Sequence, residues 1–284
     1  MVGVLGVSAS AILVRFSQAP SGVTAAYRLG WTVLLLLPVV LLRCRAELRR
    51  VTARDLVLCG ASGVLLALHF LTWFESLKRT SVASSTVLVS TEVIFTALGF
   101  ALFLHGKIPR LGVWAILLAF GGSALLALSG GGGAGELSGN LLALAAASAA
   151  AVYTLIGRIQ RGHLSTTVYT FLTYLACFLT LLLGTAAAGT PLTGYGGREW
   201  LIGLALAVLC TLLGHSLFSW CLKYLSPSYV SAAKLCEPVF SSLAAIPLFG
   251  EVPGPLQLAG GAAVLGAVLL YTCLLYTSPS PRDS

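Results

Sequence analysis

The stretches LKRTSVASSTVLVSTEVIF (77–95) and LKYLSPSYVSAAKLCEPVF (222–240) begin with Leu-Lys and end with a glutamate, two more residues and a phenylalanine. They lie about 145 residues apart, which indicates a duplicated unit. Each places a lone carboxylate, Glu92 or Glu237, in an apolar run long enough to cross a bilayer. An ionised side chain is costly there and is retained mainly where it faces a partner or an aqueous path. The two glutamates are therefore the first candidates for function.

Composition places the chain in the membrane. It is 57% hydrophobic and 9% charged, with a mean hydropathy of +0.95, whereas soluble domains carry about 25% charged residues. The net charge of +8 does not indicate nucleic-acid binding, because the basic residues collect between apolar runs instead of along a soluble face. The seven cysteines contain no C-x-x-C pair and lie mostly in apolar runs, so neither a disulfide framework nor a metal site is expected.

Apolar runs of nearly the length of a membrane helix, about 20 residues, recur ten times. They lie near 1–16, 24–42, 55–77, 82–104, 111–129, 139–157, 166–187, 199–221, 228–249 and 255–275. The sequence therefore predicts an all-α integral membrane protein with ten transmembrane helices. A Gly-rich linker at 131–138 separates a first repeat at 1–130 from a second repeat at 139–272. The linker is not a phosphate-binding loop, because no Lys-Ser/Thr follows the glycines.

The basic residues predict the orientation, since short cytoplasmic loops are enriched in Lys and Arg. If the chain starts inside, ten basic residues fall in cytoplasmic loops: Arg43, Arg45, Arg49, Arg50, Arg54, Lys107, Arg110, Arg158, Arg161 and Lys223. Four fall on the opposite side: Arg15, Lys78, Arg79 and Arg198. Both termini are then cytoplasmic. Five helices per repeat make the second copy upside down relative to the first, which is an inverted repeat.

Both ends of the sequence are unusual. The first run has about 16 residues and no basic segment before it, so we expect a first helix that lacks its beginning instead of a signal peptide. The residues at 273–284 resemble the translation of a sequencing-library adapter, and we expect them to be non-native. An ordinary polar tail is the alternative.

Further motifs recur in both halves. Ala26-Tyr27-Arg28 opens the second run, and each glutamate is followed by a related turn, Gly106-Lys107-Ile108-Pro109 or Gly250-Glu251-Val252-Pro253. With these motifs in order from Ser8 to about Thr272, the chain resembles the EamA family of ten-helix permeases within the drug/metabolite transporter superfamily.

The resemblance implies alternating-access transport of small metabolites, often amino acids, in the cytoplasmic membrane of a prokaryote. Two positions depart from the family pattern: Val93 stands where proline is usual, and Lys107 where glutamate is usual. The first predicts a fourth helix that is less kinked than the ninth. The second changes the charge of a loop.

Glu237 has a cation and a proline beside it. Lys234 lies three residues earlier, on the same helical face, so a pair is expected. Pro238 removes a backbone hydrogen bond and bends the helix, and interrupted helices near mid-bilayer bind substrates in inverted-repeat transporters. A purely structural ion pair is the alternative.

Glu92 has no opposite charge within one helical turn. Its partner comes from another helix, or it is protonated, because desolvation disfavours the charged form. We predict that Glu92 couples transport to protons or binds a substrate amine. A neutral carboxyl hydrogen-bonded to Ser or Thr across a helix interface is the alternative.

Arg28 either reaches the outer interface or binds a substrate carboxylate through its planar fork. His69 and Trp73 are one turn apart on the third run, and His215 and Trp220 occupy a comparable stretch of the eighth. These aromatic residues line a cavity or simply pack. Glu75 has Lys78 and Arg79 at i+3 and i+4, which predicts an interfacial ion pair.

Other function classes lack support in the sequence. The four histidines are isolated and form no H-E-x-x-H motif, and there is no nucleotide-binding loop, so we expect neither an enzyme nor an ATP-driven pump, and no cofactor or metal. The expected partners are a small-molecule substrate and the lipid bilayer, without nucleic acid or nucleotide. A homodimer is one state such a permease could adopt. The leading prediction is a secondary transporter of amino acids or related polar solutes. The alternatives are an exporter of lipophilic cations with the same fold and a membrane assembly subunit that does not transport.

Overall fold

The chain is helical throughout the part that the structure describes. The computed structural model describes residues 2–103, 110–129, 134–215 and 236–277, and these ranges contain no β-strand. The helices are α1 (Val2–Phe16), α2 (Ser21–Arg43), α3 (Arg45–Leu48), α4 (Ala53–Arg79), α5 (Val82–Val89), α6 (Glu92–Phe103), α7 (Arg110–Ser129), α8 (Ala134–Gln160), α9 (Thr166–Ala187), α10 (Gly197–Ala205), the π-helix η1 (Leu206–His215), α13 (Cys236–Phe249) and α14 (Pro255–Thr277).

Each of the ten apolar runs contains a helix, but the helices differ in length. Five are long and apolar enough to cross a membrane: α2, α4, α8, α9 and the combined α10–η1. The apolar parts of the other five runs contain 10–17 residues in the described ranges. Helix α8 begins at Ala134, before the expected start at 139. Its first turn carries Glu136, and a negative charge near the N-terminus stabilises a helix.

The fourth run is interrupted just before Glu92, although Val93 and not a proline follows the glutamate. Helix α5 ends at Val89 and α6 begins at Glu92. At the break the Ser90 hydroxyl donates to the Thr86 carbonyl (2.9 Å) and the Thr91 hydroxyl donates to the Leu88 carbonyl (2.6 Å). Hydroxyls that bond to backbone carbonyls compete with helical hydrogen bonds and bend helices. The fourth run is therefore interrupted without a proline. Its comparison with the ninth run stays a prediction, because residues 216–235 lie outside the described ranges.

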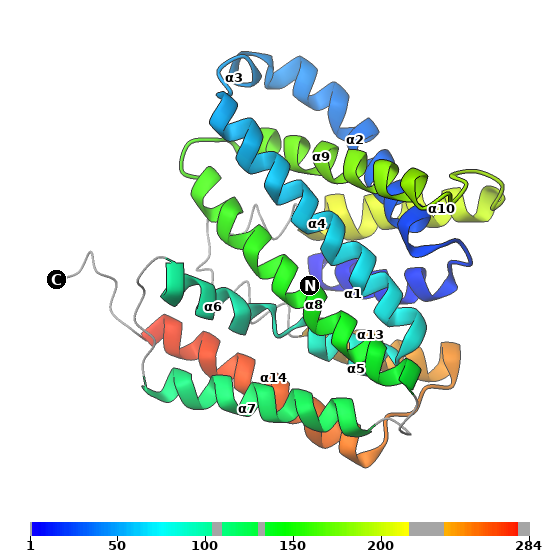
Figure 1. Cartoon of the computed structure of the whole chain (residues 1–284), viewed down its shortest axis with the longest axis vertical. Coiled ribbons are helices and arrows are strands. Elements are labelled where there is room, and N and C mark those ends of the chain that lie inside the picture. The colour runs from blue at the N-terminus through cyan, green and yellow to red at the C-terminus, as the bar shows by residue number, and fades with distance from the viewer. Residues whose placement is uncertain (1, 104–109, 130–133, 216–235, 278–284) are drawn as a thin grey trace.

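The helix contacts repeat when the first half of the chain is exchanged for the second. Helix α4 packs against α8 and α9, and its counterparts α10 and η1 pack against α2 and α1, respectively. Likewise α5 and α6 pack on α8, just as α13 packs on α1. Two counterpart pairs contact each other directly: α2 packs on α9, and α7 packs on α14 (Figure 1). We call α4, α5, α6, α8 and α9 the first bundle, and α1, α2, α10, η1 and α13 the second bundle.

Counterpart helices run in opposite directions. At one end of the molecule, which we call the Arg15 end, α1 finishes and Arg15 contacts Leu77 at the end of α4. The start of α8 is also at this end, since Gly139 lies against Thr80. At the other end, which we call the Asp55 end, α4 begins and Gln160 at the end of α8 contacts Asp55. Helix α8 thus starts where its counterpart α1 stops.

The two sets of basic residues also separate to the two ends as far as the described ranges reach. Loops that contain Arg43 to Arg54 and Arg158 to Arg161 meet at the Asp55 end, where Glu47 accepts a hydrogen bond from the Ser165 amide (2.6 Å). Arg198 donates to the Phe16 carbonyl (3.1 Å) at the Arg15 end. Lys107 and Lys223 lie outside the described residues.

Small residues set the closest helix contacts. Gly122 of α7 and Gly260 of α14 lie face to face, and a Cβ on either would be 2.9 Å from the carbonyl oxygen of the other. Gly63 of α4 lies against α9, where a Cβ would be 2.7 Å from two backbone atoms. Such residues let membrane helices approach closely, and the buried alanines of α8 belong to the same class of small packing residues.

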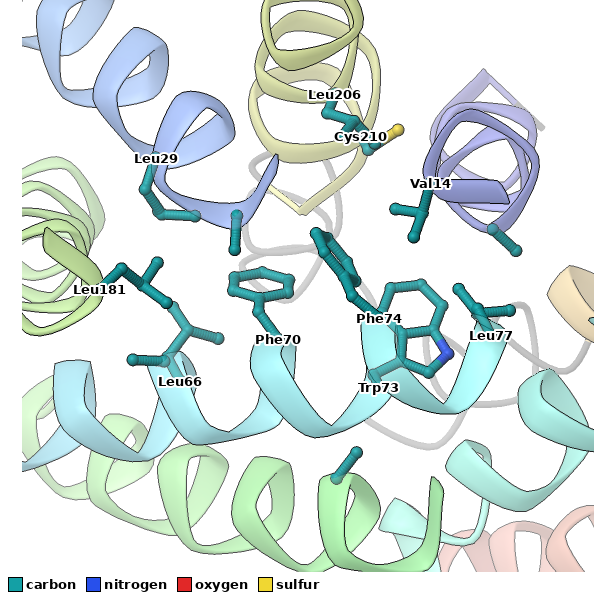
Figure 2. Packing of buried hydrophobic residues seen from close by; sticks show 14 of the residues in the cluster. Val14, Leu29, Leu66, Phe70, Trp73, Phe74, Leu77, Leu181, Leu206 and Cys210 are labelled. Carbon is teal, nitrogen blue, oxygen red and sulfur yellow. The ribbon is translucent and has the colours of Figure 1, made fainter. Parts of the chain in front are cut away.

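The largest apolar core lies where the two bundles meet. Phe70, Trp73, Phe74 and Leu77 project from α4 towards Val14 of α1, Leu29 of α2, Leu181 of α9, and Leu206 and Cys210 of η1 (Figure 2). A second cluster is built from α5, α6, α7, α8 and α14, and it includes Leu88, Ile94, Leu126 and Val264. Trp73 belongs to the first core, and Arg28 lies beside its Phe70.

Candidate functional site

Arg28 is buried in the interface between the bundles. It lies about two turns into α2, which begins at Ser21, and its side chain is 1% exposed. Its Nε donates to the Thr211 hydroxyl (2.9 Å), and its Nη1 donates to the Ser10 hydroxyl (3.1 Å). The interpretation that Arg28 reaches the outer interface is therefore wrong, because the helix turns this residue towards the core.

Aromatic residues of α4 lie beside Arg28. The guanidinium carbon lies 4.4 Å from the centroid of the Phe70 ring, a cation–π distance. His69 and Trp73 stack at 5.8 Å, and His69 Nδ1 is 3.0 Å from the Ala146 carbonyl oxygen. The Trp73 side chain is buried, and its Nε1 has no hydrogen-bond partner in the part of the chain that the structure describes. Trp73 thus offers a buried donor next to the Arg28 region.

Thr211, which binds Arg28, lies in a π-helix. Its hydroxyl also lies 3.3 Å from the Leu206 carbonyl oxygen, five residues earlier. π-Helical turns are rare overall, but those that occur are often at functional sites. The extra residue in the turn alters which side chains face a neighbouring helix. His215 is the last residue of η1, and nothing is described of its side chain.

Glu237 belongs to the same region as Arg28. It is half-buried in the first turn of α13, close enough for its carboxylate to act electrostatically on Arg28 and Cys210. Pro238 follows Glu237 in that turn and is buried. Lys234, Trp220 and the expected bend upstream of Pro238 fall outside the described residues, so the Lys234–Glu237 pair stays a prediction.

Glu92 lies apart from this group. It is the first residue of α6 and is half-buried, and the Thr154 hydroxyl of α8 donates to its Oε1 (2.8 Å). The alternative interpretation of Glu92, a carboxyl hydrogen-bonded to Ser or Thr across a helix interface, predicts a partner of this kind. That contact leaves the proposed coupling role open, because a carboxyl can accept this bond whether or not it carries a proton.

Two tyrosines that the sequence analysis did not single out lie between these places. Tyr174 of α9 is buried beside Arg28 and Cys177, and Tyr153 of α8 is an electrostatic neighbour of both Tyr174 and Glu92. Their only sequence signal is a hydroxyl within each of the sixth and seventh apolar runs. Ser10 and Thr211 were also missed, because single hydroxyl residues in apolar runs are common.

The arrangement can bind an anionic group. A guanidinium held by two hydroxyls and an aromatic face presents its planar fork to a carboxylate, and the nearby Glu237 supplies the opposite charge. In the described ranges no group of three or more His, Cys, Asp or Glu residues could hold a metal ion. Glu75, by contrast, forms the expected ion pair with Arg79 (2.8 Å) at the molecular surface.

Comparisons with known proteins give a consistent result. The profile of the EamA-like transporter family matches residues 1–128 and 137–273. The "pseudopaline exporter CntI" of Pseudomonas aeruginosa is 24% identical over 207 residues, which are 73% of this chain and 72% of that protein. The "probable terminal-alkyne amino-acid exporter" of Streptantibioticus cattleyicolor is 28% identical over 233 residues, 78% of this chain and 75% of that protein.

A solved crystal structure has a similar fold. Its TM-score is 0.63 at 18% identity, with 97% of this chain and 96% of that chain covered. At this identity the likeness concerns the fold alone.

Proposed function

The chain belongs to the EamA-like transporter family, and from this membership we propose that it is a secondary transporter of small zwitterionic metabolites, such as amino acids and their relatives. The proposal includes ten membrane helices arranged as two inverted repeats and both termini in the cytoplasm. The transporter works by alternating access in the cytoplasmic membrane of a prokaryote. Members of a transporter family move solutes and are not enzymes.

The observation that carries the proposal is the burial of Arg28 with Glu237 nearby. A guanidinium with a 1% exposed side chain is costly within a bilayer and marks functional sites. Its two described hydrogen bonds go to neutral hydroxyls, Ser10 and Thr211, instead of a carboxylate. A zwitterionic substrate could place its carboxylate at Arg28 and its amine towards Glu237. The names of two relatives, a pseudopaline exporter and a probable terminal-alkyne amino-acid exporter, also support this substrate class.

The substrate class is tested with purified protein in proteoliposomes. Arg28→Gln should reduce counterflow of a labelled amino acid by at least about tenfold, because a charge-assisted hydrogen bond to the carboxylate is lost. Arg28→Lys, which keeps the charge but not the fork, should retain part of the rate. The matched control is Arg49→Gln, an exposed arginine at the end of α3. Wild-type rates in the Arg28→Gln protein would reject the proposed site.

A ligand screen separates the substrate classes. Amino acids and carboxylates should raise the Tm of the wild-type protein but not of Arg28→Gln. Stabilisation by tetraphenylphosphonium alone would instead favour a lipophilic-cation exporter, in which the α4 aromatic residues and the glutamates bind the cation. No ligand effect and no counterflow of either class would favour an assembly subunit.

We propose that Glu92 is the proton-coupling group of this transporter. It lies at the break between α5 and α6, and the Thr154 hydroxyl of the neighbouring α8 donates a hydrogen bond to it. Glu92→Gln should leave ligand-induced stabilisation intact while it makes transport independent of an imposed pH gradient. Thr154→Val is the companion variant and should shift the pH dependence without abolishing it. An unchanged response to the gradient in Glu92→Gln would reject the role.

A further inference from the structure

An ion pair far from Arg28 joins four segments at the Arg15 end. Arg15, in the last turn of α1, binds Glu251 in the turn between α13 and α14. The same guanidinium donates to the carbonyls of Leu77 and Thr80, while Glu251 Oε2 accepts the Val82 amide (2.7 Å). One ion pair thus provides hydrogen-bond partners for carbonyls at the end of α4 and for an amide at the start of α5.

The local chemistry suits both helix termini. The last carbonyls of a helix attract a cation, and the first amides attract an anion. Leu77 and Thr80 provide such carbonyls, and Val82 provides such an amide. Arg15 and Glu251 therefore each bind a helix terminus whose partial charge is opposite to their own. Neither glutamine nor lysine could make the same set of contacts at Arg15, because the fork donates to three oxygens from two bundles.

The contacts cross from one bundle to the other. Arg15 lies on α1 and Glu251 directly follows α13, both in the second bundle, whereas the Leu77–Val82 turn joins α4 to α5 in the first bundle. Lys78 makes a second cross-bundle contact nearby, since its Nζ donates to the Ala19 carbonyl after α1 (2.6 Å). Charged groups therefore fasten this end of the interface in addition to the apolar packing of Val14 and Leu77.

The pair can also separate without leaving a charge buried. The side chains of Arg15 and Glu251 are 27% and 18% exposed. A cavity of about 280 Å³ adjoins Glu251 and is lined in part by Ser81, Ser242 and Gln257. Water in this cavity could solvate both groups once they part, so the cost of separation is far below that of a fully buried pair.

We infer that the Arg15–Glu251 pair is a gate, which closes the Arg15 end of the substrate path and parts when the bundles separate there. This inference rests on the proposed transport function, because a gate has a role only if the two bundles alternate. It adds a specific element to that function: the turn between α4 and α5 is released from α1 and α13 in one step, since both bonds depend on the same pair.

The test measures access to the cavity. Ser242→Cys places a thiol on its wall, and site-resolved mass spectrometry follows alkylation by a charged maleimide in the full-length protein without substrate. Arg15→Gln and Glu251→Gln should each raise the alkylation rate by about tenfold, the effect of losing hydrogen bonds to a charged group. The double variant should be no faster than either single variant, because both changes remove one shared interaction.

Matched variants make the result decisive. Glu75→Gln removes an ion pair at the same end but within α4, and it should leave the rate unchanged. Arg15→Lys keeps a charge at the site if a glutamine variant fails to fold, and it should give an intermediate rate. Unchanged rates in both single variants, or a double variant whose effect is the product of the singles, would overturn the gate. Faster alkylation in a protein that moves no solute would show that the pair holds the Arg15 end closed, but it would reject the transport proposal and with it the role as a gate.

Discussion

Helix α4 spans the molecule, and its two ends are held by different partners. At its start, Thr52 and Asp55 form a reciprocal cap, and Asp55 also binds Gln160 (3.1 Å) and His163 (2.7 Å) from α8 and the turn after it. At its end, the Leu77 carbonyl and the following turn are bound by Arg15 and Glu251. The first set of contacts stays within one bundle, whereas the second joins two bundles.

If the two bundles alternate as proposed, the difference indicates which end of α4 separates from its partners. Contacts within a bundle persist when bundles move as rigid bodies, and contacts between bundles are remade. The start of α4 should therefore move together with α8 and α9, and its end should lose its neighbours when the Arg15 end opens. Changes at the start should thus affect stability most, and changes at the end should affect stability less.

The largest effect is expected where α4 meets α9. Gly63→Leu should lower the free energy of unfolding by roughly 3 kcal/mol or more, because the side chain would overlap backbone atoms of Thr173 and Cys177. Thermal unfolding in detergent measures it. The control is Gly60→Ala on the same helix, since a Cβ there meets nothing within 4 Å. A Gly63→Leu protein as stable as wild type would show that α4 and α9 are not rigidly joined.

The next effect concerns the cap of α4. Asp55→Ala should lower the Tm clearly, because it removes the capping box and leaves the buried Gln160 amide without its acceptor. Asp55→Asn keeps one acceptor oxygen and should cost less. The accessibility of Ser242→Cys should not change in either variant. An increase would mean that the two ends of α4 are coupled and would break the comparison.

A smaller effect is expected at the start of α5. The Ser81 hydroxyl accepts the Ser84 amide (3.1 Å), so Ser81→Ala should cost about 1 kcal/mol, the usual value of an N-terminal cap. Ser81→Asp keeps an acceptor and is the matched control in thermal unfolding. If Ser81→Ala destabilised the protein more than Asp55→Ala did, the end of α4 would be the more firmly held one.

The smallest effect is expected for Glu75. Its pair with Arg79 is between 36% and 45% exposed, and solvent-screened pairs of this kind contribute at most about 0.5 kcal/mol. Glu75→Gln should therefore leave the Tm within error of wild type, and the amide oxygen can still accept from Ser21. A Tm loss as large as that of Ser81→Ala would assign Glu75 a role in holding this end.

Much of this arrangement could be predicted from the sequence. The apolar runs located a helix in each of ten places, and the basic residues separated to two ends, because length and charge are local properties of the chain. Arg28 and Glu237 were also recognised as candidates, since a charge inside an apolar run is visible without a structure. The expected Glu75–Arg79 pair is confirmed for the same reason, because it depends only on helical spacing.

Other features could not be predicted, because they depend on contacts between distant segments. The partners of Arg28 come from α1 and η1, and Glu251 is 236 residues from Arg15. The break before Glu92 arises from hydroxyl groups whose hydrogen bonds depend on the local backbone, so the search for a proline missed it. Ser10, Thr211, Tyr153 and Tyr174 are unremarkable residue types in apolar runs.

The burial of Arg28 also has a consequence for biosynthesis. Its helix leaves the ribosome long before Thr211, which is 183 residues later in the chain, so α2 enters the bilayer with an arginine whose second-half partner does not yet exist. The mean hydropathy of 1.9 for α2 supports insertion despite this charge. Ser10 on α1 is the partner that is already present. Insertion of η1 is then the step at which Arg28 gains its second partner.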